Sequence, residues 1–239
     1  MPIISTAHAV NSAGPIITEP RGERGFTKVD IADAIQATIV AGDKTSVKIE
    51  AAANILPLIH SKVEGDTLKV YVDGSFRSNQ PIIVRITAPH LTAAQGSGAS
   101  RISLKGFKES DFEGNVSGAS TLTFDGMAKS LKSESSGAST ASFNFISGGE
   151  VQLEASGASR ITVLGTCERV TADASGGSHL DLALLKAENA EATASGASTI
   201  KVAANRGLRV DASGASQIIY TGNANVSQEI SGASSVTKG

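Results

Sequence analysis

Five acidic residues recur at one place in this sequence, two residues before the first serine of the tetrapeptide Ser-Gly-Ala-Ser. They are Glu134, Glu154, Asp173, Asp211 and Glu229. If successive copies lie on stacked strands, these side chains form an outward ladder with a step of about 4.8 Å. Such a ladder is a candidate site for a cation such as Ca²⁺, which prefers oxygen ligands. Clustered carboxylates also serve as acid and base in polysaccharide-cleaving β-helices.

A simpler interpretation of this ladder is a solvated strand face whose charge keeps the sheet soluble. Neighbouring carboxylates repel one another. Asn115 and Thr193 fill the same position in two other copies, and Thr193 interrupts the acidic series. Lys132 and Arg209 are close enough in sequence to neutralise part of it. The five residues therefore stay candidate cation ligands, and no metal is assigned.

Other catalytic arrangements are not indicated. The four histidines lack metal-ligand spacing: His8, His60, His90 and His179. His179 and Asp181 share one outward strand face, but no activated serine or cysteine completes a triad. The repeat serines would be eight equivalent nucleophiles, which favours a structural role. We therefore predict no enzyme, no catalytic residue and no cofactor, and expect Cys167 to be a small buried side chain.

The tetrapeptide itself predicts the architecture. Its copies begin 18 to 20 residues apart, at Ser97, Ser117, Ser136, Ser156, Ser175 (as Ser-Gly-Gly-Ser), Ser195, Ser213 and Ser231. This period is too short for paired-helix repeats and fits one turn of a β-helix. Every second residue around each copy is apolar or small, which is the alternation of a strand. We predict an all-β, right-handed parallel β-helix in which the glycine and second serine of each copy face inward.

Three segments are expected along the chain. Residues 1–25 read as a flexible lead-in, 26–95 as a β-rich capping region, and 96–239 as the solenoid. Within the cap we expect strands at 26–31, 35–40, 46–50, 67–72 and 81–87, and a short helix at 54–62 limited by Pro57. The last coil, at Ser231, is expected to be an open end.

Composition excludes two classes of partner. The chain of 239 residues carries a net charge of −2, so we expect no nucleic-acid binding. No apolar run reaches the roughly 18 residues of a transmembrane helix. Residues 1–10 lack the basic and apolar regions of a signal peptide.

The repeat array, preceded by a segment ending in Gly65-Asp66-Thr67-Leu68-Lys69-Val70, resembles the bacterial family of "putative auto-transporter adhesin, head GIN domain" proteins. The resemblance covers nearly everything from Phe26 to Gly239. It implies a β-helical protein exported to the periplasm or cell surface of a Gram-negative bacterium. It supplies no binding residues.

Three functions remain open from sequence. The first is a noncatalytic envelope or surface protein that contacts glycans or another surface protein. The second is a scaffold that assembles end to end through its C-terminal coil. The third is a polysaccharide-active enzyme, in which Glu154 and Asp173 are the residues to test.

Overall fold

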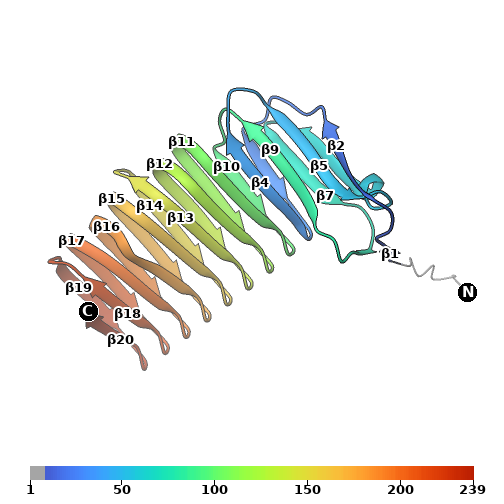
Figure 1. Cartoon of the computed structure of the whole chain (residues 1–239). Coiled ribbons are helices and arrows are strands. Elements are labelled where there is room, and N and C mark those ends of the chain that lie inside the picture. Colours follow the sequence, from blue (N-terminus) through green and yellow to red (C-terminus); the bar gives the residue numbers. More distant parts are fainter. Residues whose placement is uncertain (1–8) are drawn as a thin grey trace, which may run out of the picture.

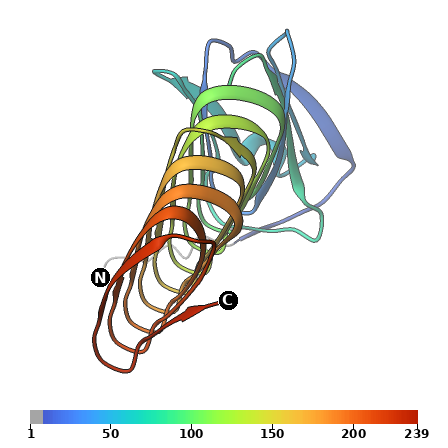
Figure 2. The same ribbon diagram turned by 90° about the vertical axis from the view of Figure 1, so that its left-hand side faces the viewer.

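The structure, a computed structural model, describes residues 9–239 apart from the side chain of Phe145. The chain forms an elongated all-β rod, with β1 (Val10–Asn11) at one end and the C-terminus at the other (Figure 1). Seen from the C-terminal side, the coils stack one behind another as a series of rings (Figure 2). The predicted parallel β-helix is confirmed, with about 7 turns.

The repeat region consists of parallel strands that pair in register with the next coil. They are β10 (Ala93–Gly96), β11 (Arg101–Val116), β12 (Thr121–Ser135), β13 (Thr140–Ser147), β14 (Glu150–Ala155), β15 (Arg160–Ala174), β16 (His179–Ala194), β17 (Thr199–Ala212), β18 (Gln217–Thr221), β19 (Asn225–Ile230) and β20 (Ser235–Lys238). The long strands turn a second, wider corner where the register shifts, as between Lys105 and Lys108. A coil therefore has two sheet faces, joined by one tight corner and one wide corner.

Each tight corner is a tetrapeptide held to its neighbour by the backbone. The N–H of Ala158, for example, donates to the carbonyl oxygen of Gly137 at 2.7 Å. Gly157 has a φ of +70°, and a Cβ at this residue would lie 2.7 Å from that same oxygen. The corner glycine is exposed, so its predicted inward orientation is wrong. A left-handed residue interrupts the two-residue alternation on which the prediction depended.

The predicted inward orientation of the second serine is confirmed. Ser159 is 2% exposed, and its hydroxyl donates to the carbonyl oxygen of Ser135 at 3.0 Å. Equivalent bonds to the preceding coil are made by Ser139, Ser178, Ser198 and Ser216. These bonds satisfy hydroxyls that would otherwise be buried without a partner, as those of Ser100 and Ser120 are.

Small and aliphatic side chains fill the space between the two sheet faces. Phe112 and Phe124 stack there with ring centroids 4.1 Å apart. Cys167 is buried in the same core, as expected, and burial raises the pKa of its thiol to about 12. Because each coil is a single thin layer, its apolar side chains are buried only by contact with the neighbouring coils.

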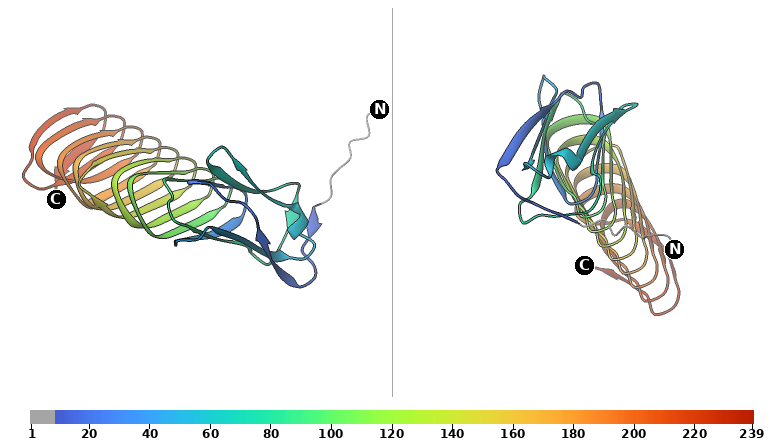
Figure 3. Two further views of the ribbon diagram at one scale, coloured as in Figure 1. Left: turned by 90° about the horizontal axis from the view of Figure 1, so that it is seen from above. Right: turned by 90° about the vertical axis from the view of Figure 1, so that its right-hand side faces the viewer.

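The N-terminal part combines parallel coils with antiparallel strands. Its strands are β2 (Ile16–Arg21), β3 (Lys28–Ile31), β4 (Ile35–Ala41), β5 (Ser46–Ala52), β6 (Ile59–Glu64), β7 (Thr67–Val72), β8 (Phe76–Arg77) and β9 (Ile82–Ala88). Strands β3 and β4 form a coil that lies between β7 and β9 on one side and β10 and β11 on the other. The antiparallel pairs at this end of the rod are β2 with β5, β5 with β9, and β6 with β7 (Figure 3).

Two expectations for this part differ from the structure. Residues 16–21, expected in a flexible lead-in, form β2 along β5; Pro20 is tolerated because β2 pairs on one side only. The part of the lead-in at residues 1–8 lies outside the described residues. The expected helix at 54–62 is a single 3₁₀ turn, Leu56–Leu58, followed by β6. Pro57 lacks the N–H that a longer helix needs, and Ile59 begins a strand that pairs with β7.

Candidate functional site

The stacking places the five predicted acidic residues on one outward sheet face. Glu134 pairs in register with Glu154, and Glu154 with Asp173. Thr193 follows Asp173 and separates it from Asp211 and Glu229, which are in register beyond it. We call this line of residues the carboxylate row. Gln95 and Asn115 extend it toward the N-terminal end.

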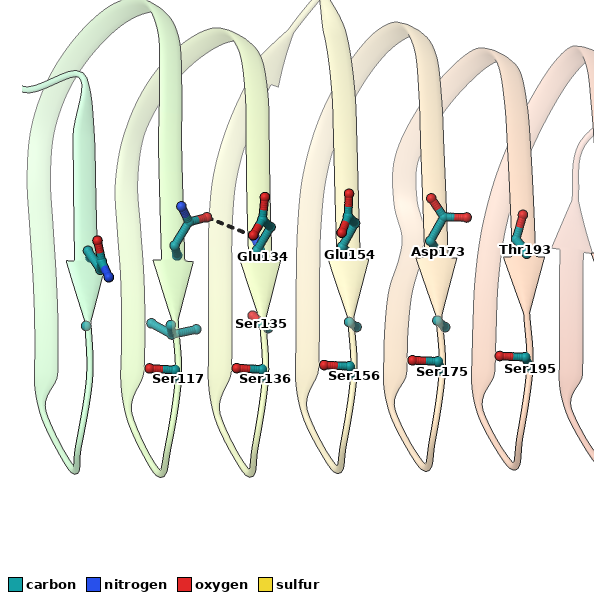
Figure 4. A pocket seen from close by; sticks show the side chains of 16 residues that line it. Ser117, Glu134, Ser135, Ser136, Glu154, Ser156, Asp173, Ser175, Thr193 and Ser195 are labelled. Carbon is teal, nitrogen blue, oxygen red and sulfur yellow. Dashed lines mark hydrogen bonds between the residues drawn. The ribbon is translucent and has the colours of Figure 1, made fainter.

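A second line of polar groups runs parallel to the carboxylate row. It consists of the first serine of each tetrapeptide, and we call it the serine row. Figure 4 shows Ser117, Ser136, Ser156, Ser175 and Ser195 with their hydroxyl groups all turned toward the preceding coil. One inward residue separates the two rows on each strand, so every coil presents an acceptor and a hydroxyl at equivalent places.

A groove of about 420 Å³ lies between the two rows. It extends across successive coils from Gln95 to Ser195, and includes Glu134, Glu154 and Asp173. Asp211 and Glu229 share the face but not the groove lining. The structure therefore brings three of the five predicted residues together in one depression.

Only part of the carboxylate row is neutralised by a neighbouring side chain. Lys132 lies 3.0 Å from the carboxylate of Glu134, and this hydrogen bond raises the pKa of Lys132. Arg209, expected to neutralise the row, instead lies 3.9 Å from Glu191. Within residues 9–239, no ion pair reaches Glu154 or Asp173. The centre of the groove is therefore acidic and open to a hydrogen-bond donor.

The donors and acceptors of the groove also bond along the rod. The N–H of Glu134 donates to the side-chain oxygen of Asn115 at 2.9 Å, and the Asn115 amide donates to Glu113 at 2.8 Å. The first of these bonds joins two neighbouring coils and is the dashed line that ends at Glu134 in Figure 4. The second lies within β11. Among the described residues, no group of three or more His, Cys, Asp or Glu side chains has the arrangement of a metal site.

Sequence reasoning missed the extension of this face into the N-terminal coils. Gln95 pairs with Asp30, and Asp30 with Lys69. Partial burial raises the pKa of Asp30, and the positive charge of Lys69 acts in the opposite direction. Residues 32–35, Ala-Asp-Ala-Ile, occupy the place of a tetrapeptide but keep only its alanine, so the sequence alone does not identify them as a copy.

His179 and Asp181 lie on the other sheet face, away from the groove. His179 pairs with Arg160 and Thr199, and Asp181 with Lys201. Burial, followed by the charge of Arg160, lowers the pKa of His179. This face therefore carries mixed charges and no continuous row.

The fold and the two rows define a class: parallel β-solenoids that display periodic polar groups along a rigid rod. Within that class, the chain belongs to the family described as "Putative auto-transporter adhesin, head GIN domain", whose profile matches residues 25–224. The resemblance found in the sequence is thereby confirmed.

Solved structures share this fold at low sequence identity. A "putative adhesin" from Parabacteroides distasonis ATCC 8503 has a TM-score of 0.90 and 17% identity, covering 97% of this chain and 100% of that one. A "Putative lipid binding protein" from the same organism has a TM-score of 0.89 and 19% identity, covering 97% and 99%. A "putative adhesin" from Parabacteroides merdae ATCC 43184 has a TM-score of 0.88 and 15% identity, covering 96% and 98%.

No curated protein matches the chain. Within the described residues there is no helix with the length and apolarity that crossing a membrane requires.

Proposed function

We propose that this protein is a noncatalytic surface or envelope protein of a Gram-negative bacterium, and that it contacts glycan chains through the groove between the carboxylate row and the serine row. The observation that carries the proposal is the strict register of the two rows over successive coils. Membership of an adhesin-named family supports the surface role.

The chemistry of the groove suits a polyhydroxylated polymer. Glu154 and Asp173 accept hydrogen bonds from hydroxyl or amino groups, and charge-assisted bonds of this kind are among the stronger ones in proteins. Ser156 and Ser175 both donate and accept. A polymer whose repeat is close to the strand spacing of about 4.8 Å meets the same pair of groups at each step. A polyanion such as nucleic acid is disfavoured, because the unpaired carboxylates repel phosphate.

The serines of successive coils have equivalent positions along the rod, which argues for binding without catalysis. Ser136, Ser156 and Ser175 occupy the same place in successive coils, and within residues 9–239 none is hydrogen-bonded to a histidine. An activated nucleophile needs such a base beside one particular serine. Weak contacts repeated along a polymer give avidity without any single strong site.

A glycan array tests the proposal with a matched pair of double variants. Glu154→Gln with Asp173→Asn removes two charges from the groove, and Glu188→Gln with Asp125→Asn removes two charges outside it. Wild type and the second variant should bind the same glycans, and the first should bind them at least tenfold more weakly. The proposal is wrong if wild type binds no glycan or if both variants bind equally. Release of reducing ends by wild type, lost in the groove variant, would instead identify a polysaccharide-active enzyme.

One observation favours end-to-end assembly as a second candidate function. Strands β19 and β20 each pair with one strand only, and Ile230 is 44% exposed. An unpaired strand edge is a template for pairing with another chain. Light scattering over a range of concentrations tests this: growth of the mean mass supports assembly, and a constant monomer mass excludes it.

A further inference from the structure

The coil made by β19 and β20 has a free strand edge. Among the described residues β19 pairs only with β17, and β20 only with β18. Three side chains of β19 are in register with buried residues of β17: Val226, Gln228 and Ile230. Because side chains in register on parallel strands point to the same side, these three form the terminal layer of the core. Val226 is half-buried and Ile230 is 44% exposed, so this layer is apolar and only partly covered.

The opposite end of the rod is closed by other groups. Strand β2 carries Pro20, which has no N–H to offer to a further strand. Arg21 donates a hydrogen bond to the carbonyl oxygen of Ile59 on β6 at 3.4 Å, and Ser61 on β6 donates to the carboxylate of Glu23. These bonds join β6 to β2 and to the residues that follow it. Within residues 9–239, the C-terminal coil is therefore the end of the rod that can accept another strand.

The sequence of β19 is complementary to itself when two copies run in opposite directions. With Gln228 opposite its own counterpart, Val226 of each copy lies opposite Ile230 of the other, because both residues are two positions from Gln228. On the outward side, Ser227 lies opposite Glu229 of the other copy, and a serine hydroxyl donates to a carboxylate. The two Gln228 amides each have donors and an acceptor, so they bond reciprocally. This pairing covers the apolar side chains and gives each polar one a partner.

Strand β20 is less suited to be the centre of such a contact. Its Lys238 is exposed and is in register with Tyr220, and a charge on an edge strand opposes pairing. Val236 is half-buried and adds to the apolar layer. The observations therefore favour β19 as the centre of the interface and β20 as its rim.

We infer that two molecules of this protein associate tail to tail, with their C-terminal coils in contact and their β19 strands paired antiparallel about Gln228. Such an interface uses the same patch on both molecules and closes on itself, so association stops at a dimer. The inference rests on end-to-end assembly, the second candidate function above, and limits that assembly to a pair. The dimer is a rod of double length that carries two grooves, which gives avidity for a long glycan.

Cysteine variants test the register directly. The native Cys167 is buried and stays in place. Residues opposite one another in an antiparallel pair have Cα atoms about 4.5–5.5 Å apart, within the range of a disulfide. Gln228→Cys should therefore form a disulfide-linked dimer on mild oxidation. Val226→Cys alone should not, because its two copies would lie about 14 Å apart, but a mixture of Val226→Cys and Ile230→Cys should.

Light scattering over a range of concentrations measures the association itself. The mean mass of wild type should rise and level off at twice the monomer mass. Ile230→Lys should raise the Kd of the dimer about tenfold or more, because it places a charge in the apolar layer. The matched control is Leu184→Lys on β16, where the leucine is 68% exposed; it should leave the Kd unchanged. Thermal denaturation checks that each variant is folded.

The outcomes separate this inference from both candidate functions. A constant monomer mass overturns tail-to-tail pairing and end-to-end assembly together. Growth beyond a dimer supports assembly and overturns the closed pair. A dimer in which Gln228→Cys does not cross-link, or which Ile230→Lys and Leu184→Lys weaken equally, overturns pairing about Gln228. Glycan binding by the groove is decided separately, by the array and its groove variant.

Discussion

The carboxylate of Asp33 accepts a hydrogen bond of 2.7 Å from the backbone N–H of Val72. Asp33 has a φ of 63°, the only positive value at a residue other than glycine in the described part of the chain. It holds the place of the tetrapeptide glycine, since the N–H of Ala99 donates to its carbonyl oxygen at 2.8 Å. The left-handed backbone costs roughly 1–2 kcal/mol, which the bond to Val72 offsets.

This arrangement predicts different effects for two substitutions of Asp33. Asp33→Ala keeps the strained backbone and loses the hydrogen bond, so it should lower the free energy of unfolding by about 2–3 kcal/mol. Asp33→Gly loses the same bond but relieves the strain, and should cost about 1 kcal/mol or less. Urea denaturation measures both. Equal destabilisation by the two variants would show that backbone strain at this residue is negligible.

Two glycines in neighbouring coils should respond in opposite ways to alanine. At Gly157 the φ of +70° and the carbonyl of Gly137, 2.7 Å from the added Cβ, both oppose substitution. Gly157→Ala should therefore destabilise the rod by about 2 kcal/mol or more. Gly177 stands where other copies have alanine, and its added Cβ would lie 3.7 Å from the nearest atom. Gly177→Ala should be neutral or stabilise by about 0.4–1 kcal/mol, as thermal denaturation of both variants would show.

The inner serines offer a second matched pair. The hydroxyl of Ser159 bonds to Ser135, whereas the hydroxyl of Ser120 is buried without a partner. Ser159→Ala should cost about 1 kcal/mol, because it leaves a carbonyl oxygen with one fewer donor. Ser120→Ala removes an unsatisfied group and should leave stability unchanged or slightly higher. If both substitutions cost the same in urea denaturation, the bond to Ser135 is not what stabilises the corner.

The β6–β7 hairpin should be sensitive to acid. Hydrogen bonds from Lys62 and then Lys69 lower the pKa of Glu64 to about 2. Because the folded pKa is below the unfolded value of roughly 4.3, the stabilisation is complete above that value and is lost as pH falls toward 2. A ¹³C NMR titration of the Glu64 carboxyl should give the low midpoint. In Glu64→Gln the hairpin should lose this dependence, and an unchanged acid response would assign it to other groups.

The repetition in the sequence made the fold predictable. Each tetrapeptide defines a corner, and equal spacing of the corners places Glu134, Glu154 and Asp173 in register without any knowledge of coordinates. Alternation likewise predicted that the second serine, such as Ser159, is buried. The groove between the two rows follows from the same register.

Departures from the repeat could not be predicted. Asp33 replaces glycine, and its coil was not recognised because a carboxylate substitutes for the conformational freedom of glycine through its bond to Val72. The spacing of Leu56, Ile59 and Val63 fits a helix, but pairing with β7 selects a strand. Arg209 is close to Asp211 in sequence, but its side chain lies beside Glu191, the residue in register with it on the neighbouring strand. Each result depends on a partner distant in the chain.

The coil made by β3 and β4 lies between two coils that come after it in the chain. The order of synthesis is therefore not the order of stacking. When residues 28–41 are synthesised, the strands that pair with their two edges do not yet exist. One edge is paired only when residues 67–88 are available, and the other only when residues 101–105 are available. These non-local pairings require a large loss of chain entropy and should form slowly. Every later coil pairs with a coil that precedes it in the chain. The N-terminal half therefore acts as the template for folding of the rest of the rod.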